Sequence, residues 1–305
     1  MSGKVPEPPR DLAALRALRA DGTTRLGVVG WPIDHSASPA LHGAALATLA
    51  AAEPSFASWE YRAYALRPEE LAEALPLAAE RGFRGLNLTV PHKMEVLPLV
   101  DRLAPSAERI GAVNTLLWEE DGLHGLNTDG YGLEEGLREA FGLGMAGQLV
   151  LVLGAGGAAR AAVAEAVHQG AARVFVANRT EDRAVELARR FAGGVTEVAA
   201  VPLADAGHRA EPGTLVVNAT SLGLRPGDPQ PFPAAELPER CLLYDMVYNP
   251  PETPWLAAGR ARGYPVANGL GMLLHQGARA LEIWTDRPAP LAPMREALEG
   301  FLAGA

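Results

Sequence analysis

The most constraining feature of the sequence is an uninterrupted apolar run that leads directly into a glycine-rich turn. The run Leu149–Leu153 contains only Leu and Val, and Gly154, Gly156 and Gly157 follow it before a helical pattern that extends through Ala171. A short run without polar alternation is typical of a strand that is buried on both faces, as in a parallel sheet. Glycines let the chain turn tightly from such a strand into a helix. The segment therefore predicts a β-α unit.

Short apolar runs and longer helical patterns alternate along most of the chain. Helical patterns begin at Ala40, Pro68 and Asn268, and Ser38 followed by Pro39 predicts a helix start with the serine as N-cap. This alternation predicts the α/β class with a mainly parallel sheet, including another β-α unit after residue 110. The remaining predicted strands are residues 26–29, 83–90, 174–176, 215–217 and 242–247.

Length and composition indicate two compact domains with a small-molecule partner. The 305 residues exceed the size at which single cores stop growing, roughly 250–300 residues. The net charge of −9 comes with no basic cluster, so nucleic-acid and membrane partners are not expected. Cys241 is interpreted as a buried thiol, and the histidines show no metal-site spacing, so no metal is expected. Residues 1–24 lack the apolar core of a signal peptide, which favours a cytoplasmic protein with an N-terminal polar arm or surface helix.

The glycine-rich turn also matches the G-x-G-x-x-A pattern of dinucleotide-binding loops. Gly154 permits the tight turn, Gly156 lets the backbone approach a pyrophosphate, and Ala159 lets the helix pack close to the strand. Similar turns also occur without a nucleotide, which is the alternative. An NAD site would place an acid at the tip of the next strand, whereas this chain has Arg179 followed by Thr180 there. These residues favour the 2′-phosphate of NADP.

Lys93 requires an explanation of its own because the chain has only one other lysine, Lys4, among 27 basic residues. Arginine does not release its proton at ordinary pH, whereas a lysine can lose and regain one when its surroundings lower its pKa. Lys93 also follows directly after a predicted strand. A proton-transfer role is the resulting hypothesis, and a chance surface lysine is the alternative.

Most asparagines of the chain lie just past a predicted strand. In an open α/β sheet, ligands bind outside the carboxyl ends of the strands, so this placement favours a binding site. Asparagine also adopts turn conformations readily, which is the alternative explanation for some of them. The seven asparagines are Asn87, Asn114, Asn127, Asn178, Asn218, Asn249 and Asn268.

These motifs together resemble those of the shikimate dehydrogenase family, in that family's order, over about residues 25–285. The resemblance implies a two-domain enzyme that uses NADP to interconvert 3-dehydroshikimate and shikimate, on the pathway to chorismate and the aromatic amino acids, as a monomer or homodimer. Besides the glycine loop and Asn178-Arg179-Thr180, the matching segments are Ser36-Ala37-Ser38-Pro39, Asn87–Lys93, Gly111–Thr115, Gly125–Gly130 and Gly269–Gln276.

The resemblance also implies the domain limits. A substrate-binding catalytic domain would span residues 1–129, and a Rossmann-like NADP-binding domain would span residues 130–267. Residues 268–305 would form C-terminal helices that return to the substrate domain. At Asn268 the chain departs from the family's pattern, which has an aspartate there.

The resemblance assigns a role to individual residues, with Lys93 and Asp129 as the catalytic pair. Hydride delivery to a ketone builds negative charge on oxygen, which an ammonium can stabilise and protonate while a carboxylate orients it or relays a proton. Substrate would contact Ser36, Ser38, Asn87, Thr89, Lys93, Asn114, Asp129, Tyr248 and Gln276. NADP would contact Gly154, Ala155, Gly156, Gly157, Ala158, Asn178, Arg179, Thr180, Arg183, Thr220, Met246, Gly269 and Met272.

Three other functions stay open on the sequence. A quinate/shikimate dehydrogenase that uses NAD would carry an acid at the position of Arg179. A tetrahydrofolate-pathway dehydrogenase would have a similar architecture but would not need the paired serines Ser36 and Ser38. A catalytically inactive ligand sensor would not need Lys93 and Asp129, whose presence argues against it.

Overall fold

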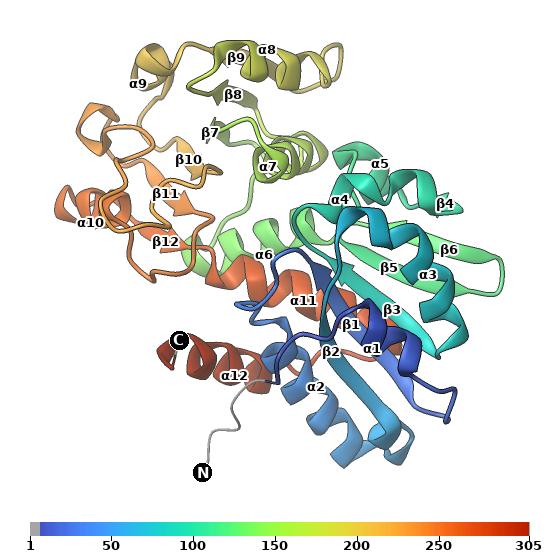
Figure 1. The fold of residues 1–305 in the computed structure, drawn as a ribbon. Helices are drawn as coiled ribbons and strands as arrows, with labels where there is room; N and C mark the ends of the chain where they lie inside the picture. The colour runs from blue at the N-terminus through green and yellow to red at the C-terminus, as the bar shows by residue number, and fades with distance from the viewer. Residues whose placement is uncertain (1–6, 305) are drawn as a thin grey trace. The chain divides into compact units, whose positions relative to one another are not determined.

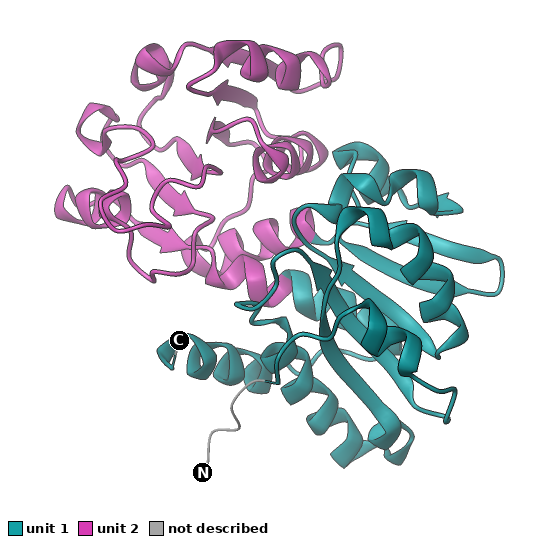
Figure 2. Ribbon diagram, in the orientation of Figure 1, with its two compact units in different colours: residues 1–128, 276–305 teal, residues 129–275 magenta. Residues whose placement is uncertain are grey.

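The chain folds into two compact units, each built around its own sheet (Figure 2). The computed structural model describes residues 7–304. The first unit comprises residues 1–128 and 276–305, and the second comprises residues 129–275. The chain therefore leaves the first unit, builds the second and returns. The prediction of an α/β fold with two domains is confirmed (Figure 1).

The return point differs from the predicted boundary between residues 267 and 268. Helix α11 (Leu270–Thr285) runs through the observed boundary without a break. Its first turn belongs to the second unit, because the Met272 N–H donates to the Tyr244 hydroxyl oxygen at 3.2 Å and Gly271 lies against Gly136. A change of domain inside one helix leaves no turn signal in the sequence.

The first unit has a mixed six-stranded sheet in the order β2-β1-β3-β5-β6-β4. Strands β1, β2 and β3 run parallel, whereas β5 runs antiparallel to both β3 and β6. The expected β-α unit after residue 110 is therefore wrong: a two-residue connection joins β5 to β6, and Gly122 follows it at φ 126°. The strands are β1 (Thr24–Gly30), β2 (Trp59–Ala65), β3 (Phe83–Leu88), β4 (Arg102–Leu103), β5 (Thr115–Glu119) and β6 (Gly122–Leu126).

Helices of the first unit pack in pairs: α2 packs with α12, and α1 packs with α3 (Figure 1). The helix predicted from Pro68 is present as a 3₁₀ turn that continues into α3. The α-helices are α1 (Leu12–Ala17), α2 (Ser38–Ala52), α3 (Leu71–Glu80), α4 (His92–Glu95), α5 (Pro105–Ile110) and α12 (Leu291–Ala303). The 3₁₀ helices are η1 (Pro54–Ser58), η2 (Pro68–Glu70) and η3 (Leu97–Leu99).

The N-terminal arm contributes to the core of the first unit. Asp11 caps α1 by accepting a hydrogen bond from the Ala14 N–H at 2.8 Å, and Leu12 and Leu15 are buried in the same cluster as Val29 of β1. The predicted surface helix is thus present, although two of its leucines are buried. Residues 1–6 of the predicted arm lie outside the described part of the chain.

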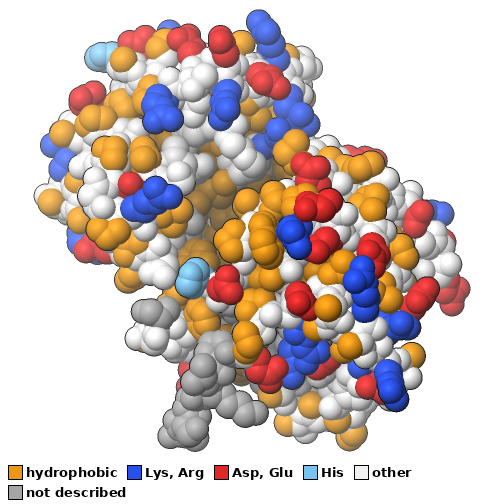
Figure 3. Space-filling model, viewed as in Figure 1, with side chains coloured by type: hydrophobic (Ala, Val, Ile, Leu, Met, Phe, Trp, Pro, Cys, Tyr) orange, Lys and Arg blue, Asp and Glu red, His pale blue; other side chains and the backbone are white. Residues whose placement is uncertain are grey.

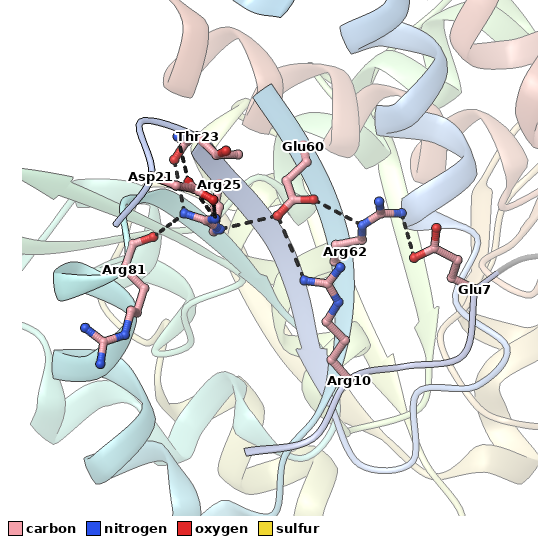
Figure 4. A network of polar contacts seen from close by, with 8 residues as sticks. All are labelled: Glu7, Arg10, Asp21, Thr23, Arg25, Glu60, Arg62 and Arg81. Carbon is pink, nitrogen blue, oxygen red and sulfur yellow. Dashed lines mark hydrogen bonds and ion pairs between the residues drawn. The ribbon is translucent and has the colours of Figure 1, made fainter. Parts of the chain in front are cut away.

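A network of charges ties the segment before β1 to the first two strands (Figure 4). The Arg25 side chain is only 4% exposed and donates to both carboxylate oxygens of Asp21, at 2.9 and 3.0 Å. It also lies 3.3 Å from Glu60, which pairs with Arg62 at 3.3 Å and Arg10 at 3.9 Å. A buried charge is tolerated only when it is paired in this way, so the network fixes the arm to the sheet.

The second unit has an entirely parallel sheet in the order β12-β11-β10-β7-β8-β9. Counted from the first strand of this unit, the order is 6-5-4-1-2-3, the doubly wound arrangement that binds dinucleotides. The prediction that Leu149–Leu153 is buried on both faces is confirmed, since Val150, Leu151 and Val152 are fully buried. The strands are β7 (Leu149–Leu153), β8 (Arg173–Ala177), β9 (Glu197–Val201), β10 (Leu215–Asn218), β11 (Leu242–Asp245) and β12 (Val266–Asn268).

The remaining features of the described chain concern burial and charge. Cys241 is buried, and burial raises the pKa of its thiol to about 11, as expected for an inert cysteine. No helix within residues 7–304 is long and apolar enough to cross a membrane. On the face drawn in Figure 3, acidic and basic side chains are interspersed over each unit.

Besides α11, the second unit has α6 (Asp129–Phe141), α7 (Gly157–His168), α8 (Glu181–Arg189), η4 (Leu203–Asp205), α9 (Ala206–Arg209), η5 (Ala234–Glu236) and α10 (Pro254–Ala261).

Candidate active site

Sheet topology gathers most of the predicted substrate residues at one edge of the first unit. Strands β1, β3 and β6 end at this edge, and β5 begins there because it runs antiparallel to β3 and β6. Ser36 follows β1, Thr89 and Lys93 follow β3, Asn114 precedes β5, and Thr128 follows β6. Segments that are far apart in the sequence thus deliver their side chains to the same edge.

The two serines lie at the start of α2. The helix begins at Ser38 itself with Ala37 as its N-cap, so the prediction of Ser38 as the N-cap is wrong. The reason is that Ser36 takes over part of the capping: its hydroxyl oxygen accepts a hydrogen bond from the Ser38 N–H at 3.3 Å. Both serines are half-buried. Two hydroxyls beside a helix start form a suitable site for a carboxylate.

Lys93 lies on the short helix α4, which is anchored on both sides. Its backbone oxygen accepts a hydrogen bond from the Val113 N–H at 2.8 Å, next to Asn114. The imidazole Nε2 of the preceding His92 lies 2.8 Å from the Leu66 carbonyl oxygen. The half-buried Lys93 side chain therefore projects from a fixed turn rather than a loose loop.

Asn114 has a fixed amide orientation. Its Oδ1 accepts hydrogen bonds from the Thr128 N–H at 2.8 Å and from the Thr115 hydroxyl at 2.9 Å. Its Nδ2 donates to Thr128 Oγ1 at 3.0 Å and lies 3.5 Å from Gln276 Oε1. The structure thus brings together two predicted substrate residues, Asn114 and Gln276, that are 162 positions apart. The amide oxygen and the amide nitrogen of Asn114 thus both have partners within the protein, and these contacts fix the orientation of the amide.

Asn87, like Asn114, uses most of its hydrogen-bonding capacity within the protein. Its Nδ2 donates to the Asn114 carbonyl oxygen and to Thr115 Oγ1, both at 3.2 Å. Its Oδ1 accepts from the Tyr61 hydroxyl at 2.8 Å. Tyr61 belongs to none of the recognised motifs and was not predicted as a site residue.

Asp129 and Tyr248 lie in the second unit. Asp129 is the first residue of α6 and directly follows Thr128 in the chain. In the same turn, the space where Gly130 would carry a Cβ is filled by the Glu165 carboxylate, so this turn packs closely on α7. Tyr248 is half-buried, and burial raises the pKa of its hydroxyl.

The glycine-rich loop has the geometry expected of a phosphate-binding turn. Gly154 adopts φ 117°, a conformation that favours glycine, and its N–H donates to the Ala177 carbonyl oxygen at 2.8 Å. Helix α7 begins at Gly157 with Gly156 as N-cap, and a Cβ at either glycine would meet no atom within 4 Å. The open helix start leaves backbone N–H groups accessible to phosphate oxygens.

The tip of β8 carries the predicted 2′-phosphate residues. Asn178 Nδ2 donates to the Thr180 carbonyl oxygen at 2.8 Å and shapes the turn, while Arg179 and Arg183 are exposed beside the start of α8. Because β7 and β8 are adjacent and parallel, this tip lies at the same edge as the glycine loop. Arg160, in the first turn of α7, is a further cation at this edge that the sequence reasoning missed.

Asp245, at the end of β11, was also missed, although it fixes two loops of the predicted cofactor site. The carboxylate is fully buried and accepts from Asn218 Nδ2 at 2.9 Å, Thr253 Oγ1 at 2.7 Å and the Val247 N–H at 3.0 Å. Asn218 Oδ1 in turn accepts from the Thr220 hydroxyl at 2.7 Å. Burial raises the pKa of Asp245, and these hydrogen bonds oppose that shift. The signal in the sequence that could have identified Asp245 is an aspartate at the end of an apolar strand.

Met246 and Gly269, two further residues of the predicted cofactor site, lie against each other. The Gly269 N–H donates to the Val247 carbonyl oxygen at 3.1 Å, and a Cβ at Gly269 would overlap the Met246 carbonyl oxygen. The neighbouring Asn268 accepts from the Leu270 N–H at 3.1 Å and donates to the Pro251 carbonyl oxygen at 2.8 Å. An aspartate could make the first of these contacts but not the second.

Comparison with known proteins decides the family. The family model described as the shikimate dehydrogenase substrate binding domain matches residues 28–116, the shikimate / quinate 5-dehydrogenase model matches residues 137–223, and the shikimate 5'-dehydrogenase C-terminal domain matches residues 269–299. A protein of Geobacter metallireducens named shikimate dehydrogenase (NADP(+)) is 45% identical over 90% of this chain and 96% of its own. The chain belongs to the shikimate dehydrogenase family.

Solved structures of shikimate dehydrogenase relatives agree with this assignment. The shikimate 5-dehydrogenase of Thermus thermophilus, in complex with NADP(H) and shikimate, is 38% identical, with a TM-score of 0.80 over 92% of this chain and 100% of its own. A quinate dehydrogenase of Corynebacterium glutamicum, in complex with NAD, is 30% identical, with a TM-score of 0.80 over 91% and 99% of the two chains. The fold is thus shared by proteins with different ligands, so cofactor and substrate must be argued from individual residues.

Proposed function

We propose that this chain reduces 3-dehydroshikimate to shikimate, reversibly and with NADPH, and that Lys93 and Asp129 are its catalytic pair. The enzyme class and the cofactor follow from the family: it is an NADP-dependent shikimate dehydrogenase, like the relatives that carry this name. The single observation that carries the finer proposal is the edge of the first sheet, where the anchored Lys93 turn adjoins the oriented Asn114 amide. The reaction belongs to the pathway toward chorismate and the aromatic amino acids.

The preference for NADP over NAD is supported by the tip of β8. Arg179 and Arg183 are exposed there, and both can pair with a 2′-phosphate, whereas an acid for a ribose 2′-hydroxyl is absent from the Asn178-Arg179-Thr180 turn. The open start of α7 would hold the pyrophosphate. The quinate alternative with NAD is therefore not favoured.

Substrate recognition relies on hydrogen bonds more than on charge. Ser36 and Ser38 would bind the carboxylate at the start of α2. Thr89, Asn114 and Gln276 would bind the ring hydroxyls, with Asn114 Nδ2 donating in exchange for its 3.5 Å contact with Gln276. A buried polar residue that has lost its intended partner costs free energy, so such a site discriminates against molecules lacking a matching hydroxyl.

The chemical step requires one hydride and one proton. When held by the glycine-rich loop and the tip of β8, NADPH would supply a hydride to the carbonyl carbon, and the carbonyl electron pair would move onto oxygen. The Lys93 ammonium stabilises this negative charge and donates the proton that completes the hydroxyl group. The Asp129 carboxylate orients the ammonium and relays a proton to restore it. In the oxidative direction the same groups accept the proton.

The test is NADPH oxidation with 3-dehydroshikimate, followed by absorbance for the parent chain, Lys93→Arg and Asp129→Asn. The parent is expected to turn over, and each variant is expected to lose about 10²–10⁴-fold in kcat. In Lys93→Arg the positive charge is kept, but arginine cannot exchange a proton. The urea unfolding midpoints of the variants control for folding. A parent without turnover would contradict the proposed reaction. A Lys93→Arg variant with most of the parent kcat would contradict proton transfer by Lys93.

A further inference from the structure

Tyr61 is a buried tyrosine whose ring is held by aromatic neighbours from two helices. It projects from β2 and is 5% exposed. The His42 ring of α2 stacks on it with centroids 4.2 Å apart and an interplanar angle of 14°. The Trp284 ring of α11 lies 6.2 Å away, and its Nε1 donates to the Leu116 carbonyl oxygen at 2.9 Å. The ring, and with it the direction of the hydroxyl, is therefore fixed.

The Tyr61 hydroxyl controls the amide of Asn87, which is 6% exposed. It donates to Asn87 Oδ1 at 2.8 Å, while both Asn87 N–H groups go to the Asn114 carbonyl oxygen and Thr115 Oγ1. These contacts of Asn87 are all 3.2 Å or shorter and leave it little capacity for a ligand, whereas Asn114 Nδ2 could exchange its 3.5 Å contact with Gln276 for a substrate hydroxyl. Asn87 is better suited to support a neighbouring residue than to bind substrate itself.

The supported neighbour is Asn114. Thr115 Oγ1 accepts from Asn87 Nδ2 and donates onward to Asn114 Oδ1 at 2.9 Å. A continuous series of hydrogen bonds thus runs from Tyr61 through Asn87 and Thr115 to Asn114. The direction of donation along this series makes the Asn114 oxygen an acceptor within the protein and turns its N–H group toward Gln276.

We propose that Tyr61 is a positioning residue for substrate binding, which acts through Asn87 and Thr115 to hold the Asn114 amide with its N–H group toward the substrate hydroxyls. The proposal deepens the proposed function and rests on it. Tyr61 itself makes no contact with the reacting atoms in this account. Its removal should therefore affect the affinity for shikimate and not the affinity for the cofactor, whose predicted residues lie in the second unit.

The decisive comparison is Tyr61→Phe against Tyr64→Phe. Both changes remove one buried hydroxyl from β2, but Tyr64 lies three positions along the strand, on the opposite face, where it packs with Phe83. Tyr61→Phe keeps the stacked ring and leaves Asn87 Oδ1 buried without its donor. We expect it to raise the KM for shikimate about tenfold, with little change in the KM for NADP. Tyr64→Phe should change neither KM.

Two measurements separate positioning from general destabilisation. The unfolding midpoints of both variants show whether stability alone differs, and calorimetric titration with shikimate reports affinity without turnover. In a double-mutant cycle, Tyr61→Phe should add no further loss of shikimate affinity to Asn87→Ala, because the two residues act in series.

The outcomes distinguish this inference from the proposed function. An active parent in which Tyr61→Phe leaves the shikimate KM within twofold overturns the role of Tyr61 and leaves the proposed function standing. Equal losses in both tyrosine variants, equal rises in both KM values, or additive losses in the cycle overturn it as well. A parent that neither turns over 3-dehydroshikimate nor binds shikimate overturns the proposed function and this inference together.

Discussion

His42 should make the stability of the first unit depend on pH. Its ring is fully buried, and neither ring nitrogen has a hydrogen-bond partner among residues 7–304. Burial lowers its pKa from 6.5 to about 3, and the nearby Asn87 side chain partly opposes this shift. The folded protein therefore keeps His42 neutral under conditions in which the unfolded chain binds a proton.

The sign and size of the effect follow from these two pKa values. Because the folded value lies below the unfolded one, the contribution of His42 to stability is intact above about pH 6.5 and is lost progressively as the pH falls toward 3. From about pH 7.5 to about pH 5 the loss amounts to about 2 kcal/mol. At about pH 3, where half of the folded-state imidazole is protonated, the loss amounts to about 4 kcal/mol.

The perturbation is His42→Phe, which keeps an aromatic ring against Tyr61 but removes the titrating group. The assay is urea unfolding followed by tryptophan fluorescence at the two pH values, since four of the five tryptophans lie in the first unit. Exposed His168 gives the matched control, His168→Phe. The parent and the control should lose about 2 kcal/mol more than His42→Phe between the two pH values.

The comparison between variants cancels the contributions of other acid-sensitive groups to the free energy of unfolding. His92, whose pKa is also lowered by burial, and the carboxylates are present in every variant, so their contributions cancel in the difference. If His42→Phe loses as much stability as the parent between the two pH values, His42 is not held neutral by burial and the reasoning is refuted.

Three further predictions concern the binding sites. Arg179→Ala should raise the KM for NADP about ten- to a hundredfold and leave the weaker use of NAD nearly unchanged, because a charge-assisted contact to phosphate is lost; equal efficiency with NAD and NADP in the parent would contradict it. Ser38→Ala should raise the KM for shikimate more than it lowers kcat, and the parent should prefer shikimate over quinate, whose extra hydroxyl lies beside the carboxylate; comparable kcat/KM values for the two acids would argue against discrimination by the serines. Gly269→Ala should raise the KM for NADP and lower the free energy of unfolding by about 1–3 kcal/mol, because its Cβ overlaps the Met246 carbonyl oxygen, whereas Gly300→Ala, with open space around it, should have no such cost in a urea titration.

Features that depend on neighbouring residues in the sequence were predictable. The apolar run Leu149–Leu153 and the glycines after it define a strand, a turn and a helix within one short segment, and the structure has all three. The β5–β6 hairpin was missed although Asp121-Gly122 is a recognised hairpin signal. The alternation of the surrounding pattern predicted a β-α unit at this place instead.

The support beneath the site could not be predicted in the same way. Tyr61 and His42 lie in ordinary strand and helix patterns. Only tertiary packing makes the Tyr61 hydroxyl a donor to Asn87 and leaves the His42 ring nitrogens without a hydrogen-bond partner among residues 7–304. The pairing of Asn114 with Gln276 depends on how the chain returns after the second unit, residues 129–275. Motifs therefore identify residues of the site one at a time but not the hydrogen bonds that orient them.

The return of the chain explains why the first unit needs both of its segments. The part of α11 that belongs to the first unit carries Gln276 and Trp284, and the Trp284 Nε1 bonds to the Leu116 carbonyl oxygen of β5. The indole occupies the space where a side chain at Gly85 of β3 would lie, so the sheet and the helix fit only with glycine at that position. A chain that ended at residue 128 would lack both the Gln276 partner of Asn114 and the indole beside Tyr61. Hydrogen bonds that start at Tyr61 reach Asn114 Oδ1 through Asn87 and Thr115, while Gln276 meets Asn114 Nδ2, so the substrate site that we propose requires the C-terminal part of α11 to pack on the sheet.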